Sequence, residues 1–189
     1  MIAVRTAEWT DAPGIAAVHV AAWRSTYPGI LPDAFLAGLS VPRQAAHYDQ
    51  AIRSSAAVFV AIASGSDLTT GNSPRIVGFA SAGRSRIRND SGLHPGEGEI
   101  ETLYVLDDWR EQGVGRRLMR ASATHLIEMG CKSAFLWVLR DNPSRWFYLR
   151  LRGRQVAEAS IQVAGKSIPQ TAFVWDPIEK IFEASPQPS

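Results

Sequence analysis

The chain has 189 residues, of which 46% are hydrophobic and 20% are charged, and its formal net charge is +2. This length and composition are those of one folded globular domain; the dispersed arginines and mild charge argue against a nucleic-acid-binding protein, and no apolar run approaches the roughly 20 residues of a membrane span. Because no signal-like segment opens the chain and its lone Cys131 cannot form an internal disulfide, we expect a cytoplasmic protein without nucleic-acid or membrane partners.

Hydrophobic periodicity predicts helices near the start of the chain and mostly strands after them. In chain order the expected elements are a strand at 2–5, a helix that starts after Thr10 or Asp11 and stops at Tyr27, a short helix after Pro32, a helix from about 42 to 52, strands at 56–63, 75–82 and 99–105, a helix at 113–129, a strand at 133–139, a helix from 143 to about 152, and strands at 155–163 and 167–175. We expect one hairpin with a long tip between residues 56 and 82, and a final hairpin that turns around Gly165-Lys166.

No break in composition and no internal repeat divides these elements. We therefore predict a single domain over residues 1–183, followed by a disordered tail at 184–189. Helices first, then antiparallel strands and one strand-helix-strand crossover are typical of a mixed α/β (α+β) fold with a mainly antiparallel central sheet. The nearly all-apolar strand at 133–139 indicates a sheet covered by helices on both faces.

The residues after the strand at 99–105 carry the chemistry. Here Arg110-Glu111-Gln112-Gly113-Val114-Gly115-Arg116 places two glycines at the expected start of a helix. The first amides of a helix have no internal partners and lie at the positive end of its dipole, so they bind anions, and glycines allow a ligand to approach the backbone closely. We therefore predict a diphosphate site in the loop from Glu111 to Arg116.

Other phosphate, hydrolase and metal motifs do not match. Gly165-Lys166-Ser167 has the tail of a P-loop, but Ser160 stands where the first glycine belongs, and Leu118 occupies the place of the third glycine in the dinucleotide fingerprint. The chain has no Gly-x-Ser-x-Gly elbow, and its four histidines lack metal-ligand spacing. We therefore predict no metal.

The motif Arg110-x-x-Gly113-x-Gly115 after Leu-Tyr-Val, with Asn142-Pro143 and Phe147-Tyr148 downstream, resembles the GNAT superfamily of N-acetyltransferases. The resemblance covers residues 97–153, and the flanks agree with it in element order. It implies a V-shaped splay between the strand that ends at Val105 and the strand at 133–139. It also implies that acetyl-CoA, as co-substrate, lies in that cleft.

The resemblance assigns residues to the co-substrate. Backbone groups of one strand are expected to pair with its pantetheine arm, the amides of the glycine loop to hold its pyrophosphate, and an asparagine to bond the arm from the other side. The residues expected to bind acetyl-CoA are Leu103, Tyr104, Val105, Arg110, Glu111, Gln112, Gly113, Val114, Gly115, Arg116 and Asn142.

Tyr148 is the expected proton donor to the departing thiolate, because a phenol stays protonated at neutral pH. However, the spacing from Asn142 to the Phe-Tyr pair is one residue shorter than the family's, which puts Leu149 at the donor's place. A single residue turns a helix by about 100°. Either a local kink restores Tyr148 to the cleft, which we favour, or Tyr148 faces elsewhere and packs on the sheet.

Glu99 and Glu101 are the expected general bases, since residues two apart on a strand share a face. Glu101 is nearer the expected thioester. The strand at 133–139, where some family members carry a glutamate, holds no carboxylate. The alternative is that both carboxylates lie on an exposed face and pair with Arg84, Arg86 or Arg88.

Arg24 and Tyr27 are the better candidates for a substrate wall, because Trp23 is more easily explained as a core residue. Trp109 and Trp146 are expected to pack. The acceptor is expected to be a primary amine of a small molecule or of a peptide N-terminus, and the chain can form a homodimer through its C-terminal strands. Two alternatives remain open, namely a CoA-binding regulatory module that has lost its chemistry and a non-enzymatic interaction domain.

Overall fold

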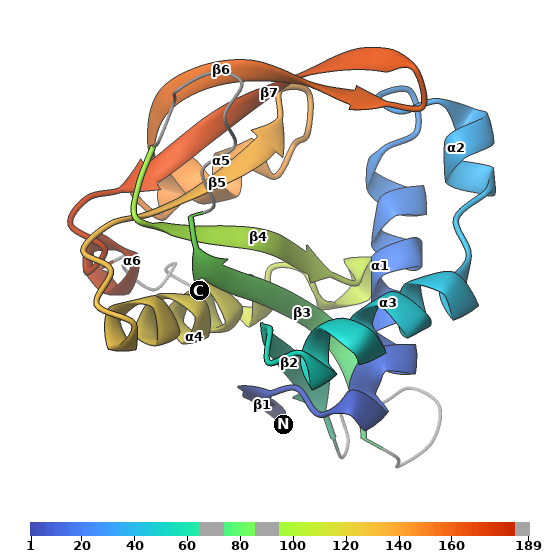
Figure 1. Cartoon of the computed structure of the whole chain (residues 1–189), viewed down its shortest axis with the longest axis horizontal. Coiled ribbons are helices and arrows are strands. Elements are labelled where there is room, and N and C mark those ends of the chain that lie inside the picture. The colour runs from blue at the N-terminus through green and yellow to red at the C-terminus, as the bar shows by residue number, and fades with distance from the viewer. Residues whose placement is uncertain (65–73, 86–94, 184–189) are drawn as a thin grey trace. The chain divides into compact units, whose positions relative to one another are not determined.

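A computed structural model describes residues 1–64, 74–85 and 95–183 (Figure 1). The chain forms two compact units, the first from residues 1–82 and 102–122 and the second from residues 83–101 and 123–189. The expected hairpin tip, Arg86, Arg88 and the predicted tail at 184–189 lie outside the described residues. One domain over residues 1–183 stays a prediction.

The first unit contains the N-terminal helices and three strands. Its elements are β1 (Ile2–Thr6), η1 (Trp9–Asp11), α1 (Ala12–Thr26), α2 (Asp33–Ala37), α3 (Val41–Arg53), β2 (Ala57–Ala63), most of β3 (Arg75–Arg84) and η3 (Asp107–Trp109). Pro13 lies in the first turn of α1 and Pro42 in the first turn of α3, where the missing N–H of proline costs no helical bond. No helix in the described ranges is long and apolar enough to cross a membrane.

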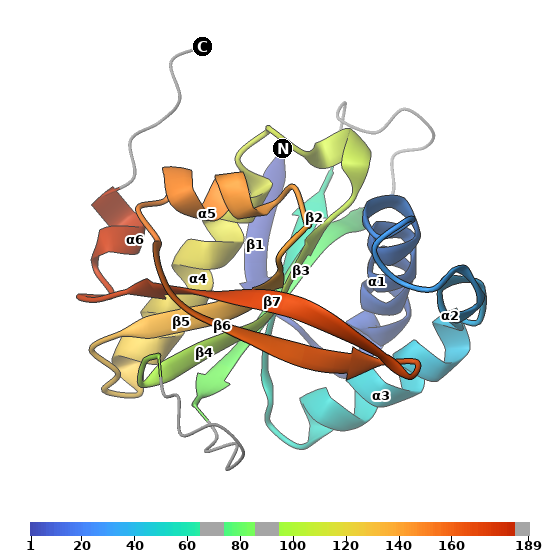
Figure 2. The same ribbon diagram turned by 90° about the horizontal axis from the view of Figure 1, so that it is seen from above.

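The second unit contains the C-terminal strands. Its elements are β5 (Ala134–Leu139), α5 (Arg145–Arg150), β6 (Arg154–Val163), β7 (Lys166–Trp175) and α6 (Lys180–Glu183). Figure 2 shows β6 and β7 as a long hairpin beside β5. Three of the described elements, namely β3, β4 (Gly98–Val105) and α4 (Val114–Glu128), begin in one unit and end in the other.

The described strands form a seven-stranded sheet in the order β1-β2-β3-β4-β5-β7-β6. The pairs β1–β2, β2–β3, β5–β7 and β6–β7 are antiparallel, whereas β4 and β5 pair in parallel at Gly98–Ala134 and Glu99–Phe135. A parallel pair needs a crossover, and α4 supplies it. The predicted mixed, mainly antiparallel fold is therefore confirmed.

Strand β2 shows why helices cover both faces of the sheet in the first unit. Its residues alternate between two cores, since Val58 and Val60 pack with Ile15, Val18 and Tyr48 from α1 and α3. On the other face, Phe59 and Ala61 pack with Val114 and Leu118 from α4. A strand buried on both faces reads as a continuous apolar run, which residues 57–63 are.

Several boundaries differ from the predictions. The hairpin between β6 and β7 turns at Ala164 and Gly165, one residue earlier than expected, where φ is 48° and 79°. Two successive residues in the left-handed region are typical of the two-residue turn that matches strand twist. The helix expected at 143–152 is the shorter α5, and neither η3 nor α6 was predicted.

An aromatic cluster around His19 occupies one face of the first unit. His19 Nδ1 lies 2.9 Å from the Tyr48 hydroxyl, and its ring stacks on Tyr104 with centroids 5.3 Å apart. Burial, with a smaller contribution from the charge of His47, lowers the pKa of His19 to about 4. Burial raises the pKa of Tyr48, so its hydroxyl stays protonated and can donate to the neutral imidazole.

We expect this histidine to make stability depend on pH. An unfolded His19 takes up a proton near pH 6.5, whereas the folded one does so near pH 4, so between these values the unfolded state binds more protons and stability falls as pH is lowered. The free energy of unfolding in urea, plotted against pH between 7 and 4, should show a slope that corresponds to one proton. The variant His19→Gln should remove this slope. The exposed neighbour provides the control, since His47→Gln should keep most of the slope. Equal slopes in the wild type and His19→Gln would contradict the assignment.

Candidate functional site

The turn after β4 is held firmly before the glycine loop begins. The Leu106 N–H donates to the Val77 carbonyl at 2.9 Å, and the Trp109 N–H donates to the Leu106 carbonyl at 2.9 Å. The Trp109 side chain is buried in the core face formed with α4, as predicted for this residue. The loop from residue 110 onward therefore starts from a fixed position within the first unit.

The backbone of the loop enters the left-handed region at two separate residues. Glu111 has φ of 62° and Gly113 has φ of 75°, whereas Gln112 between them is outside the left-handed region. Alternation of this kind turns successive N–H groups to one side and forms concavities that bind anions. Gly113 suits its position because a left-handed residue with a side chain costs about 1–2 kcal/mol.

The helix itself adds three N–H donors that have no acceptor within the helix. Arg117 makes the first α4 bond to this loop, its N–H donating to the Gly113 carbonyl at 3.1 Å. The N–H groups of Val114, Gly115 and Arg116 precede that bond and so have no carbonyl within the helix to bond to. Together with the helix dipole, they give the loop the electrostatics of an anion site.

Side chains of the loop bond within the protein. The Arg110 guanidinium lies 2.8 Å from the Asp107 carboxylate and donates to the Thr26 hydroxyl at 2.9 Å. The Gln112 amide donates to the Asp108 carbonyl at 2.8 Å. Arg110 and Gln112, both predicted to bind the co-substrate, therefore bond to neighbouring parts of the chain through their side chains.

The predicted residues of β4 differ in exposure along the strand. Glu99 is half-buried and Glu101 is exposed, with Ile100 buried between them, so the two carboxylates share a face as expected. Leu103, Tyr104 and Val105 are half-buried. The glutamates belong to the second unit and these last three residues to the first.

Asn142 and α5 lie in the second unit. Asn142 is buried, and its side-chain oxygen accepts the Ser144 N–H at 2.8 Å, so it shapes the turn that starts α5. This turn occupies the carbonyl end of the side chain.

Tyr148 is the residue of α5 that faces inward. Tyr148 is 6% exposed and packs against Phe173 and Trp175, with ring centroids 5.9 and 6.3 Å away, whereas Leu149 is 40% exposed. Tyr148 therefore lies on the inward face of this helix, whereas Leu149, which the shortened spacing puts at the position of the proton donor, lies on the exposed face. Tyr148 also packs on the sheet, which was the other expectation.

Arg24 and Tyr27, the residues expected to form a substrate wall, both contact other parts of the first unit. Tyr27 is only 7% exposed and is therefore buried more deeply than Trp23, which is half-buried. The two rings meet edge to face, with centroids 5.2 Å apart. The Arg24 guanidinium donates to the carbonyls of Leu36, Ala37 and Leu39 at the end of α2. Trp146, expected to pack, is 59% exposed.

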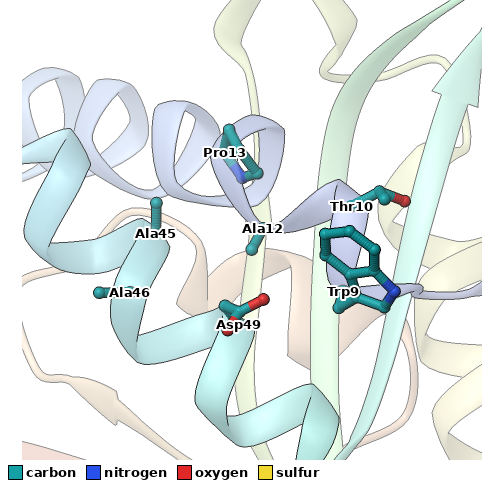
Figure 3. Close-up of a pocket in the computed structure, with 7 residues that line it drawn as sticks. All are labelled: Trp9, Thr10, Ala12, Pro13, Ala45, Ala46 and Asp49. Carbon is teal, nitrogen blue, oxygen red and sulfur yellow. The ribbon is translucent and has the colours of Figure 1, made fainter.

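An open groove of about 390 Å³ lies between the start of α1 and α3 (Figure 3). Its lining residues are Trp9, Thr10, Ala12, Pro13, Ala45, Ala46 and Asp49. The Arg53 guanidinium stacks 4.4 Å from the centroid of the Trp9 ring and donates to both Asp49 oxygens at 3.0 Å. The aromatic ring and the carboxylate that line the groove therefore already interact with Arg53. No residue of the predicted site lines it.

The sequence did not predict the two residues at the end of α1 that bond to the turn before the loop. Ser25 donates its hydroxyl hydrogen to Asp107, and Thr26 accepts from Arg110. No periodicity or motif connects positions 82 residues apart, so this contact had no sequence signal. Among the described residues, no group of three or more His, Cys, Asp or Glu could hold a metal ion.

Comparisons with known proteins agree with this geometry. The model of the acetyltransferase (GNAT) family matches residues 23–153. The chain is 33% identical over 175 residues to the uncharacterized N-acetyltransferase YuaI of Bacillus subtilis, covering 93% of each protein. An N-acetyltransferase structure from Staphylococcus aureus Mu50 has a TM-score of 0.66 at 15% identity, covering 93% of this chain and 98% of that one. The PaiA N-acetyltransferase of Thermoplasma acidophilum, solved in complex with coenzyme A, has a TM-score of 0.61 at 16% identity, covering 90% and 98% of the two chains.

The packing behind Tyr148 predicts a strong effect of Gly153→Ala. The added Cβ would lie 2.8 Å from the Trp175 ring and 3.0 Å from the Tyr148 carbonyl oxygen. Trp175 is fully buried and its indole N–H donates to the Leu151 carbonyl at 2.7 Å, so the ring cannot retreat. We expect the free energy of unfolding in urea to fall by about 1–3 kcal/mol, the usual effect of overpacking.

Gly83→Ala provides the matched control. An added Cβ at Gly83 has no atom within 4 Å, and this glycine lies in the same unit. We expect its free energy of unfolding to stay within about 0.5 kcal/mol of the wild type. Similar values for the two variants would show that the space around Gly153 is larger than described.

Proposed function

Since the chain belongs to the acetyltransferase (GNAT) family, we propose that it moves an acetyl group from acetyl-CoA to a primary amine by direct attack in a ternary complex. The binding of acetyl-CoA is supported mainly by the geometry of the loop before α4. This loop has two left-handed residues, and the first three N–H groups of the helix have no acceptor within it. A coenzyme A diphosphate is an anion of the kind that such a loop binds. The coenzyme A in the Thermoplasma acidophilum structure, which has a similar fold, supports the same ligand class.

The proposal assigns three sets of predicted residues to the donor. The loop from Arg110 to Arg116 holds the diphosphate, because its backbone has the geometry of an anion site. The backbone of Leu103, Tyr104 and Val105 pairs with the pantetheine arm, and Asn142 bonds the same arm.

The reaction needs a neutral amine, because an ammonium has no lone pair. The nitrogen attacks the thioester carbonyl, a C–N bond forms, the tetrahedral centre collapses and the C–S bond breaks. Tyr148 donates its phenolic proton to the departing thiolate, since a proton donor makes sulfur a better leaving group. Glu101, or Glu99 through a water, takes the proton that the amine loses.

The acceptor is an amine of a small molecule or of a peptide N-terminus. Arg24 and Tyr27 remain proposed substrate residues, although their side chains are bonded to α2 or packed on Trp23. A cytoplasmic location and a homodimer also stay predictions.

A thiol-release assay with acetyl-CoA tests the function directly. We expect turnover with at least one member of a panel of simple amines, polyamines, aminoglycosides and peptides with free N-termini. Coenzyme A binding without turnover on the whole panel would favour the alternative of a CoA-binding regulatory module. Failure to bind coenzyme A would reject both.

We expect Gly113→Glu to weaken coenzyme A binding by about 100-fold, because it adds a carboxylate beside two phosphates in the loop. A Cβ added at Gly113 has no described atom within 4 Å, but its φ of 75° adds backbone strain. Gly165→Glu controls for strain and charge together, because Gly165 has φ of 79° and equally open surroundings in the β6–β7 turn. Calorimetric titration with coenzyme A should separate the two variants, and equal Kd values would reject the loop assignment.

We expect Tyr148→Phe to lower kcat by about 100-fold, the lower end of the effect of a general acid. The phenylalanine keeps the ring packed on Phe173 and Trp175, so the Kd for coenzyme A and the melting midpoint should stay close to those of the wild type. Steady-state kinetics with an acceptor from the panel measures the effect. Unchanged kcat would remove Tyr148 from the donor role.

A further inference from the structure

The last turn of α1 bonds in two directions. Arg24 donates to three carbonyls at the end of α2, with distances of 2.9–3.3 Å. The next two residues, Ser25 and Thr26, bond instead to the turn that follows β4. All of these residues belong to the first unit, so the arrangement is described within one compact body.

Asp107 and Arg110 receive these bonds at the two ends of the turn. One Asp107 oxygen accepts the Ser25 hydroxyl, and the other lies 2.8 Å from the Arg110 guanidinium. The same guanidinium nitrogen donates to the Thr26 hydroxyl at 2.9 Å. The four side chains form a continuous network from Ser25 through Asp107 and Arg110 to Thr26, in which each charged group has a charged and a neutral partner.

This network is too exposed to be explained as a source of stability. The Arg110 and Asp107 side chains are 41% and 53% exposed, and pairs with such access to water contribute little to the free energy of unfolding. The network does, however, attach both ends of the turn to a helix of 15 residues. Glu111, the first left-handed residue of the anion loop, follows Arg110 directly.

We propose that Ser25 and Thr26 are positioning residues, which hold the turn through Asp107 and Arg110 and thereby set the affinity of the following loop for coenzyme A. This inference depends on the proposed function. A loop that is already ordered loses less conformational entropy when its ligand binds, so a pre-organised loop binds more tightly. Loss of the two hydroxyls frees the turn, and the loop must then be ordered by the ligand.

The double variant Ser25→Ala/Thr26→Val tests the proposal without changing any charge. We expect its Kd for coenzyme A, measured by calorimetric titration at 25 °C, to rise about five- to tenfold, which is about 1–1.4 kcal/mol. The matched control is Asp11→Asn at the other end of α1, which removes the charge that pairs with Arg5 and so weakens the bonds of 2.7 and 2.9 Å that Arg5 donates to it. This control loosens a comparable tether on the same helix and should leave the Kd within twofold of the wild type.

Asp107→Asn separates positioning from charge. Removal of a negative charge near an anion site strengthens binding if charge alone matters, whereas loss of the tether weakens it. We expect weaker binding, with Asp108→Asn as the neighbouring control at wild-type affinity.

The outcomes are distinguishable. A wild type that binds no coenzyme A rejects the proposed function and this inference with it. A wild type that binds, with the double variant no weaker than Asp11→Asn, rejects the positioning role alone. Tighter binding by Asp107→Asn also rejects it, because charge then governs the affinity. The positioning role is supported if the double variant and Asp107→Asn both bind coenzyme A more weakly than the wild type. The double variant and the Asp11→Asn control should then have equal melting midpoints.

Discussion

The change of backbone hand between β4 and α4 is the constraint on which the rest of the account depends. Glu111 and Gly113 are left-handed, and the helix that follows begins with N–H groups for which it has no acceptors. Such groups must be satisfied by solvent or by a ligand. An anion with several oxygens meets that need, and coenzyme A carries a diphosphate of this kind.

The surrounding structure keeps this loop in place. Strand β2 alternates between two cores, so helices pack on both faces of the first unit, and the buried Trp109 anchors the turn beside one of them. Ser25 and Thr26 hold the same turn from the end of α1. A loop that folding has already ordered loses less conformational entropy when a ligand binds, and this is the physical basis of the proposed positioning role.

The parts that sequence could predict are those encoded locally. Apolar periodicity placed the strands and long helices, and the glycines of the loop pointed to an anion site because only backbone geometry was needed. Contacts between distant residues could not be predicted. The sequence does not show that Tyr27 is buried against Trp23 or that Arg24 bonds to the end of α2. Ser25 and Asp107 meet across 82 positions, and the inward face of α5 depends on packing against β7, which no spacing rule contains.

A crystal structure of the chain with coenzyme A tests the central claim most directly. The account predicts diphosphate oxygens within hydrogen-bonding distance of main-chain N–H groups between residues 111 and 116. Coenzyme A bound elsewhere, or those N–H groups donating to protein acceptors in its presence, would contradict the claim.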